Sequence, residues 1–513
     1  MRFFLCFCAL LCTLSTSAAV TLPDVLADNM VLQRDQEVAV WGRATPGERV
    51  RVLFMDQQLE STADEDGEWM VRLAPLAASS VPYNLTISGE NTIVLKNILV
   101  GEVWLCSGQS NMQWRLLEAD GGAEAIARAN NPEIRLFNVS REVGFGREAG
   151  KLATWQPAVG EATAEFSAVG YFFGLALYRR LGVPIGLINA SYGGSQAEAW
   201  TPRQYLADDP DLAPTIDRET RWAEERAQVS RKYERAVQDW ERARKRALAD
   251  GDPEPRAPRV PDALRDYRIA GSIYGNMVEP LIPYGIRGVA WYQGESNEER
   301  AEQYQRLLTT MIGAWRDRWQ QGSMPFAIVQ LPNYRKVSAE PEDSAWAHLR
   351  DRQRRVADSL LNTGLIVTID IGAADDIHPT NKLPVGERLA QWALSEVYGR
   401  ETLAGGPVLR RVEYRPGEAI VYFDQVGEGL LLSEGDAPAE FALAGADGAW
   451  HWAEARLEGR TRVILSSAAV PEPVAVRYSF NSNPRRPNLT NATGIPAAPF
   501  RTDDWPGPTH GRR

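Results

Sequence analysis

The chain has 513 residues, which is too long for one compact hydrophobic core, so its length predicts two to four domains. Hydrophobic residues make up 44% and charged residues 24% of the sequence, which is ordinary for a folded protein. The formal net charge of -11 offers no basic surface, so the composition argues against binding to nucleic acid or to an anionic membrane.

The N-terminus predicts a secretory signal peptide over residues 1–19. Arg2 is followed by an apolar stretch and then by small residues, with cleavage expected near Ala18 or Ala19. A buried N-terminal strand or a short anchor is the alternative. No later stretch stays apolar for the ~20 residues that a membrane span needs. We therefore expect a periplasmic or secreted protein.

Cysteine is rare outside this predicted signal peptide. Three of the four cysteines lie inside it, and Cys106 alone would remain in the mature chain. The mature chain could then form no internal disulfide. No group of Cys and His has zinc-site spacing, so neither a metal nor a cofactor is expected.

The rest of the chain divides into three parts by pattern. Residues 20–97 alternate apolar and polar side chains between Pro and Gly turns, which predicts a small β-sandwich. Residues 98–400 alternate short apolar runs with helix-like segments, which predicts an α/β domain with a parallel sheet covered on both faces. Residues 401–506 predict a second β module. The apolar runs are Val103–Cys106, Ile185–Ala190, Val289–Tyr292, Phe326–Leu331 and Leu365–Ile371, and the helix-like segments include Phe166–Leu181 and Tyr304–Trp319.

One segment of the middle part breaks this alternation. Residues 217–250 are dense in charge and carry apolar side chains at heptad-like spacing. We expect a long amphipathic helix there, within an insertion of about residues 205–265. Such a charged helix is typical of a solvated flap, and a partner surface or a lid over the site are the alternatives.

The stretch CSGQSNMQW, residues 106–114, follows the first apolar run of the predicted sheet. Its small and polar residues fit a tight turn from a strand into a helix, where a serine hydroxyl can be exposed at the sheet edge. Ser110 is therefore a candidate nucleophile, and a helix cap is the alternative. The turn is not the G-x-S-x-G elbow of the α/β-hydrolases, because Met112 stands in place of the second glycine.

A serine nucleophile needs a base, and histidine is the usual one near neutral pH. The chain has only four histidines. His510 lies in the polar C-terminal tail, His451 in the C-terminal β module, and His348 in a helical stretch where a half-buried structural role is expected. His378 follows the last apolar run, at the carboxyl edge of the sheet where Ser110 also lies. His378 is therefore the candidate base.

Two carboxylates precede His378, Asp375 by three residues and Asp376 by two. A carboxylate bonded to Nδ1 of a histidine holds the ring in the right tautomer and stabilises the imidazolium. The D-x-x-H spacing lets the chain fold Asp375 back under the ring, so Asp375 is the first candidate and Asp376 the second. An Asp-rich turn with a surface histidine is the alternative.

Two further stretches follow predicted strands of the same sheet. Gly193 and Gly194 would let the backbone approach a ligand closely, so that an N–H can point at an oxyanion. Gln293 carries an amide that is suited to donate to the same oxygen. An ordinary turn and a polar turn residue are the respective alternatives.

The combination of these stretches carries a family resemblance. GQSNM, YGGSQAEAW, WYQGESN and DDIHPTNK resemble the four blocks of the SGNH/GDSL hydrolase superfamily, and more narrowly the sialate O-acetylesterase-type carbohydrate esterases. The likeness spans nearly the whole mature chain. It implies a three-layer α/β/α domain between β modules. It also implies Ser110 as nucleophile, His378 as base oriented by Asp375, and an oxyanion hole of the Ser110 N–H, the Gly194 N–H and Gln293.

The resemblance implies a serine esterase that removes O-acetyl groups from a sugar or glycan, with sialic acid favoured. Acetylated plant hemicellulose, xylan or xyloglucan, is the alternative substrate. Two other classes remain open: a non-catalytic glycan-binding protein, and a glycosidase that uses carboxylates such as Asp375 or Glu295. The pattern leaves the oligomeric state open.

Overall fold

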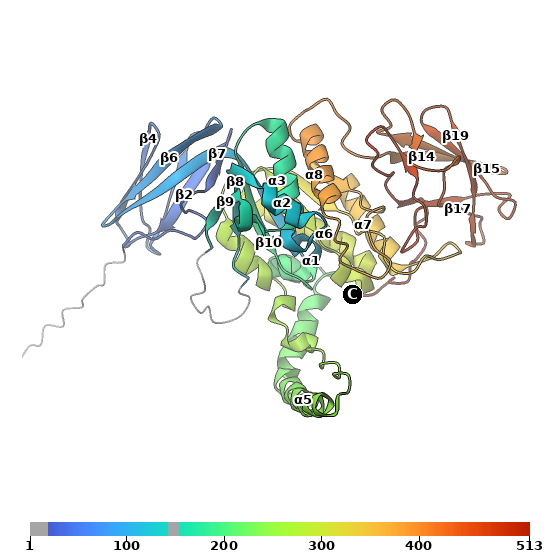
Figure 1. The fold of residues 1–513 in the computed structure, drawn as a ribbon, viewed down its shortest axis with the longest axis horizontal. Coiled ribbons are helices and arrows are strands. Elements are labelled where there is room, and N and C mark those ends of the chain that lie inside the picture. Colours follow the sequence, from blue (N-terminus) through green and yellow to red (C-terminus); the bar gives the residue numbers. More distant parts are fainter. Residues whose placement is uncertain (1–18, 142–152) are drawn as a thin grey trace, which may run out of the picture.

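The computed structural model describes residues 19–141 and 153–513. In these ranges, a sheet covered by helices lies between two β-rich parts, one toward each end of the chain (Figure 1). Residues 1–18, almost the whole predicted signal peptide, lie outside the described residues. Among the helices of the described ranges, none is both long and apolar enough to cross a membrane.

The central sheet has the strand order β13-β12-β11-β7-β10-β8-β9. All neighbouring strands on this path are parallel except β8 and β9, which are antiparallel. The predicted α/β class, with strands and helices in alternation, is therefore confirmed. The strands are β7 (Thr92–Gly108), β8 (Asn130–Asn138), β9 (Trp155–Val159), β10 (Ile185–Ser191), β11 (Gly288–Tyr292), β12 (Phe326–Val329) and β13 (Thr363–Ile366).

Helices cover both faces of this sheet because successive side chains of a strand point to opposite faces. In β7, Val103 and Leu105 pack into one core and Trp104 and Cys106 into another. The first core is closed by α6 (Ala301–Trp319) and α7 (Ala345–Ser359), and the second by α3 (Ala168–Leu181) and α8 (Leu383–Glu396). Short helices complete this part: α1 (Ser110–Gln113), α2 (Gly122–Arg128) and α4 (Arg203–Ala207).

The last predicted strand is shorter in the structure than in the sequence pattern. Leu365–Ile371 was expected to be one strand, but β13 ends at Ile366. The following backbone is held by side chains instead, because Thr368 Oγ1 donates to Gln330 O and Arg388 donates to Val367 O. The chain therefore leaves the sheet early and forms a long loop that leads to His378.

The N-terminal β part is continuous with the central sheet through β7. The first half of this 17-residue strand pairs with β6 and β1, and its second half pairs with β10 and β11. One strand thus runs across the predicted boundary at residues 97 and 98. The other strands of this part are β1 (Val31–Gln33), β2 (Val38–Arg43), β3 (Arg49–Phe54), β4 (Gln57–Thr62), β5 (Glu68–Leu73) and β6 (Ser79–Ser88).

The C-terminal β part contains two four-stranded sheets, β14-β15-β20-β19 and β18-β17-β21-β23, and the pair β16-β22. Side chains from both four-stranded sheets share one apolar core. The strands are β14 (Val408–Arg415), β15 (Glu418–Asp424), β16 (Leu431–Leu432), β17 (Phe441–Ala444), β18 (Trp450–Trp452), β19 (Glu454–Glu458), β20 (Arg462–Ser466), β21 (Ala475–Tyr478), β22 (Leu489–Thr490) and β23 (Phe500–Arg501).

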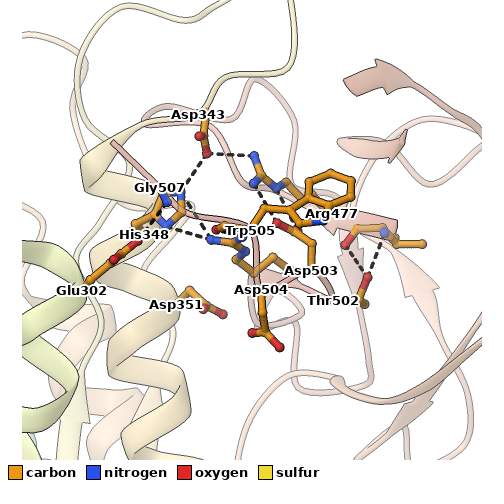
Figure 2. A network of polar contacts seen from close by, with 12 residues as sticks. Glu302, Asp343, His348, Asp351, Arg477, Thr502, Asp503, Asp504, Trp505 and Gly507 are labelled. Atoms are coloured by element: carbon orange, nitrogen blue, oxygen red, sulfur yellow. Dashed lines mark hydrogen bonds and ion pairs between the residues drawn. The ribbon is translucent and has the colours of Figure 1, made fainter. Parts of the chain in front are cut away.

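A buried polar network joins the C-terminal part to α7 (Figure 2). His348 on α7 is fully buried, more than the sequence predicted. Its Nε2 lies 2.7 Å from Asp343 Oδ1 and its Nδ1 lies 2.9 Å from an Arg501 nitrogen, while Arg501 and Arg477 both bind Asp503. These contacts account for both ring nitrogens of His348, so this histidine is structural.

The predicted charged insertion contains one long helix, α5 (Pro214–Asp250), that projects away from the sheet (Figure 1). Only Thr215 and Glu219 of its 37 residues are buried, as expected for a solvated helix. The chain returns from it through the 3-10 turn Asp266–Arg268. The Tyr267 ring packs against that of Tyr192, with centroids 5.0 Å apart, so the end of the insertion reaches the loop after β10.

Candidate active site

The turn that carries Ser110 forms where β7 ends against β11. Gly108 has a φ of +130°, and a Cβ at this position would lie 2.1 Å from Tyr292 O. Only glycine therefore lets the two strand ends approach so closely. Ser110 begins α1 directly afterwards. In the described part of the chain, no backbone or side-chain group accepts a hydrogen bond from the Ser110 N–H, as its place in the first turn of a helix implies.

His378 lies against Ser110, as the sequence predicted for a serine and its base. Ser110 Oγ is 2.9 Å from His378 Nε2, within hydrogen-bond distance. The indole of Trp114 stacks on the imidazole at a centroid distance of 5.5 Å and an interplanar angle of 20°. Two residues 268 positions apart in the chain thus meet at the carboxyl edge of the sheet.

The environment of His378 favours the neutral ring that a base requires. Burial lowers the pKa of His378, the nearby Asp376 opposes this, and the Lys382 ammonium lowers the pKa further. The imidazole is therefore largely neutral at pH 7. For Nε2 to accept the proton of Ser110, the ring hydrogen must be on Nδ1.

Of the two candidate acids, Asp376 is the one that lies beside His378. Its Oδ1 is 3.9 Å from His378 Nδ1 and accepts a hydrogen bond of 2.8 Å from the His378 backbone N–H. Within the described ranges, no hydrogen bond or ion pair joins Asp375 to His378. The preference for Asp375 is not supported by this geometry, because the Asp376 side chain folds back onto the backbone two residues later. The orienting role of either acid stays a prediction.

The loop after β10 places two glycines against the Ser110 turn. The Gly193 N–H donates to Gln113 Oε1 at 2.7 Å, and a Cβ on Gly193 would lie 3.5 Å from Ser110 Cβ. Gly194 adopts a left-handed φ of +75°. Its N–H, like that of Ser110, meets no acceptor in the described part of the chain. Neither of the two backbone N–H groups predicted for an oxyanion hole, those of Ser110 and Gly194, thus has an acceptor among the described residues.

Gln293 is placed differently from the prediction. Its side chain is fully buried, and its Nε2 donates to Ser195 O at 3.2 Å and to Asn297 Oδ1 at 2.8 Å. Its Oε1 accepts from the Tyr304 hydroxyl at 2.8 Å. Both amide hydrogens are already used, so none is left for an oxyanion in this arrangement. Gln293 instead ties the end of β11 to the loop after β10.

We expect Gln293→Ala to act mainly on stability. The substitution leaves the buried carbonyl of Ser195 without its donor, at about 1–3 kcal/mol, whereas the Tyr304 hydroxyl keeps the backbone carbonyl of residue 293 as an acceptor. Chemical denaturation should show a lower free energy of unfolding than for the wild type, whereas Gln238→Ala, an exposed amide on α5, should show no change. A variant of unchanged stability whose kcat alone falls would restore the oxyanion role to Gln293.

Three side chains that interact next to the pair are not recognisable as a group from the sequence. Asn111 Nδ2 donates to Glu295 Oε1 at 2.6 Å and to Ile377 O at 3.0 Å, and Asn111 Oδ1 accepts from Lys382 Nζ. Of the three, the sequence points only to Glu295, as a candidate glycosidase carboxylate. Lys382 gives no signal in the sequence, because a lysine in a polar loop looks the same whether it is buried or exposed.

A polar pocket of about 540 Å³ opens beside Glu295. One wall comes from the loop after β11 and the other from the returning end of the insertion. Among the described residues, no group of three or more His, Cys, Asp or Glu side chains is arranged to hold a metal ion. The pocket is lined by Gln196, Arg259, Val260, Pro261, Asp262, Arg268, Glu295, Ser296, Glu298 and Glu299.

The chain is similar to known esterases over most of its length. A family model described as carbohydrate esterase, sialic acid-specific acetylesterase matches residues 100–248 and 262–395. The sialate O-acetylesterase of Mus musculus is 26% identical over 501 residues, covering 89% of this chain and 88% of that protein. That of Rattus norvegicus is 28% identical over 429 residues, covering 75% of each.

A solved structure is similar as well. A carbohydrate acetylesterase from Xanthomonas citri superposes with a TM-score of 0.79 at 36% identity. The match covers 95% of this chain and 100% of the other. The residues matched by the family model include Ser110, Gly194, Gln293 and His378.

Proposed function

The chain belongs to the carbohydrate esterase family of sialic acid-specific acetylesterases, and we propose that it removes O-acetyl groups from carbohydrates through an acetyl-enzyme on Ser110. The observation that carries this proposal is the 2.9 Å contact between Ser110 Oγ and His378 Nε2. A serine hydroxyl becomes an effective nucleophile when a neutral imidazole is positioned to take its proton.

The geometry supports a two-step hydrolysis. Ser110 Oγ attacks the acetyl carbonyl while His378 takes its proton, and the N–H groups of Ser110 and Gly194, which have no acceptor among the described residues, stabilise the oxyanion. His378 then protonates the sugar oxygen as it leaves. In the second step His378 takes a proton from water as the water attacks the acetyl-enzyme, and it returns that proton to Ser110 Oγ as acetate leaves. Asp376 offsets the charge of the imidazolium in both steps.

The proposed substrate is an O-acetylated sugar or glycan, and O-acetylated sialic acid is the first candidate. The relatives from Mus musculus and Rattus norvegicus are named sialate O-acetylesterases, and the pocket beside Glu295 has polar walls that can hydrogen-bond a sugar. Acetylated hemicellulose, xylan or xyloglucan, is the alternative.

Finer aspects of the fold and the location belong to the same proposal. The arrangement of the four sequence blocks around Ser110 supports an SGNH-type core, and the paired sheets at each end support flanking β-sandwiches. The composition of residues 1–19 supports export to the periplasm or the medium.

An acetate-release screen tests the proposal. The substrates are O-acetylated sialic acid, acetylated xylan, acetylated xyloglucan and 4-nitrophenyl acetate, and glycosidic cleavage is followed in parallel. We expect acetate from at least one acetylated carbohydrate, without chain cleavage. Cleavage of glycosidic bonds would instead indicate a glycosidase, and glycan binding with no product at all would indicate a binding protein.

A further inference from the structure

Next to the catalytic pair, three polar side chains contact one another although they come from three different segments. Asn111 follows Ser110 in α1, Glu295 follows the end of β11, and Lys382 directly precedes α8. Asn111 and Lys382 are fully buried. Burying an ammonium and a carboxyl lowers the stability of the folded state unless other contacts offset the cost.

Asn111 bridges the Ser110 turn and the His378 loop. Its Nδ2 donates to the carbonyl of Ile377, the residue before His378. Its Oδ1 accepts from Lys382 Nζ, four residues after His378. The loop that carries the base is therefore fastened on both sides of His378 to the residue that follows the nucleophile.

Lys382 also lies against the aromatic ring that supports the base. Its Nζ is 5.8 Å from the centroid of the Trp114 ring, and Trp114 stacks on His378. A second ring, that of Tyr292, lies 5.6 Å from the same Nζ. An ammonium between two aromatic faces is favourably placed, and it fixes the orientation of those rings.

We propose that Asn111 and Lys382 are positioning residues of the esterase, which hold the His378 loop against the Ser110 turn, and that the charge of Lys382 extends to lower pH the range over which His378 acts as a base. This inference rests on the proposed function, because it concerns the efficiency of that same Ser110–His378 pair.

The charges around the pair support the second half of the proposal. Burial lowers the pKa of Lys382 to about 7, against the opposing effects of Glu295 and Asp376. Burial raises the pKa of Glu295, although the Asn111 hydrogen bond and Lys382 oppose this. Burial lowers the pKa of His378, Asp376 raises it, and Lys382 lowers it further. Burial also keeps the Tyr292 phenol neutral by raising its pKa well above the ordinary value.

The direction of the effect follows from these charges. Below about pH 7 Lys382 is charged and disfavours the imidazolium, so His378 remains a neutral base at lower pH than it otherwise would. Above about pH 7 the ammonium loses its proton, and the imidazolium that forms during the reaction is no longer opposed. The wild-type pH profile should therefore carry a second, smaller step near pH 7.

The variants Lys382→Met and Lys382→Gln separate the positioning role of Lys382 from the role of its charge. Both remove the charge, and only glutamine keeps a hydrogen-bond donor. Methionine keeps the length but has neither charge nor donor, whereas glutamine keeps an N–H that can reach Asn111. With 4-nitrophenyl acetate, both variants should lose activity at higher pH than the wild type on acidification, because His378 no longer has a positive neighbour. Both should also lack the step near pH 7. Plateau kcat should fall roughly 10- to 100-fold in Lys382→Met, and less in Lys382→Gln.

Two further variants make the measurement specific. Lys336→Met removes an exposed lysine of the same domain and should leave the whole profile unchanged. Asp376→Asn removes the negative charge beside His378. The acidic limb of its pH profile should therefore move to lower pH, whereas both Lys382 variants should move it to higher pH.

Several outcomes would overturn the inference. Folded Lys382 variants that keep the acidic limb at the wild-type pH would show that Lys382 is only structural, since a purely structural loss lowers kcat equally at every pH. Should Lys382→Met fail to fold, Lys382→Gln provides the same test of charge, because it retains the hydrogen bond to Asn111. A wild-type protein that hydrolyses no acetyl ester would instead contradict the proposed function itself.

Discussion

Ser110→Ala is expected to abolish acetate release while the protein stays folded. The Ser110 hydroxyl is the group that forms the acetyl-enzyme, and no other hydroxyl in the described ranges hydrogen-bonds to His378. Because nucleophile and base act as a unit, losing one removes most of the catalysis that both provide, and kcat should fall by roughly a millionfold. The remaining rate would come from the backbone donors and from substrate binding.

Acetate release from the best substrate of the screen measures this effect, with circular dichroism to establish that the variant is folded. Ser230→Ala is the matched control, since Ser230 lies on the projecting helix α5 and hydrogen-bonds only locally to Glu234. Near wild-type turnover by folded Ser110→Ala would exclude the serine mechanism. The carboxylates, with Glu295 first, would then be the candidate catalytic groups.

Much of this site could be predicted because it depends on local patterns. The end of a parallel strand, a glycine and a small polar turn are visible in the sequence around Ser110, and all parallel strands of a sheet end at one edge. The meeting of Ser110 and His378 followed from that rule together with the elimination of three other histidines. The same patterns predicted the layered α/β part and the long charged helix.

The directions of individual side chains could not be predicted in this way. The Gln293 amide faces Ser195, Asn297 and Tyr304, which belong to three other segments, and their convergence is a property of the tertiary structure. A strand-end amide therefore looks the same in the sequence whether it faces a substrate or a neighbouring loop.

Two other differences between the sequence prediction and the structure concern Asp375 and Lys382. Spacing alone placed Asp375 under the His378 ring, but the carboxyl two residues before a backbone N–H can close a local turn, and Asp376 does so. Lys382 resembles a solvated loop residue in the sequence, and its burial depends on Trp114 and Tyr292, which are distant in the chain.

His378→Ala should be nearly as severe as the loss of the nucleophile. Without the imidazole no group takes the proton of Ser110 Oγ, and an alkoxide does not form unaided near pH 7. Acetate release should fall by several orders of magnitude, roughly to the level of Ser110→Ala. Slow or absent labelling of Ser110 by a fluorophosphonate would show that the hydroxyl has lost its activation as well.

The other histidines serve as controls, and the structure distinguishes between them. His451→Ala, in β18, should retain wild-type kcat and stability. His348→Ala should retain kcat per folded molecule but unfold more easily, because Asp343 and Arg501 lose a buried partner.

Added imidazole can enter the space left between Trp114 and Ser110 in His378→Ala, and partial recovery of acetate release would identify the missing ring as the base. Activity in His378→Ala that needs no imidazole would show that another group deprotonates Ser110, and the buried amine of Lys382, whose pKa is about 7, would then be the first to test.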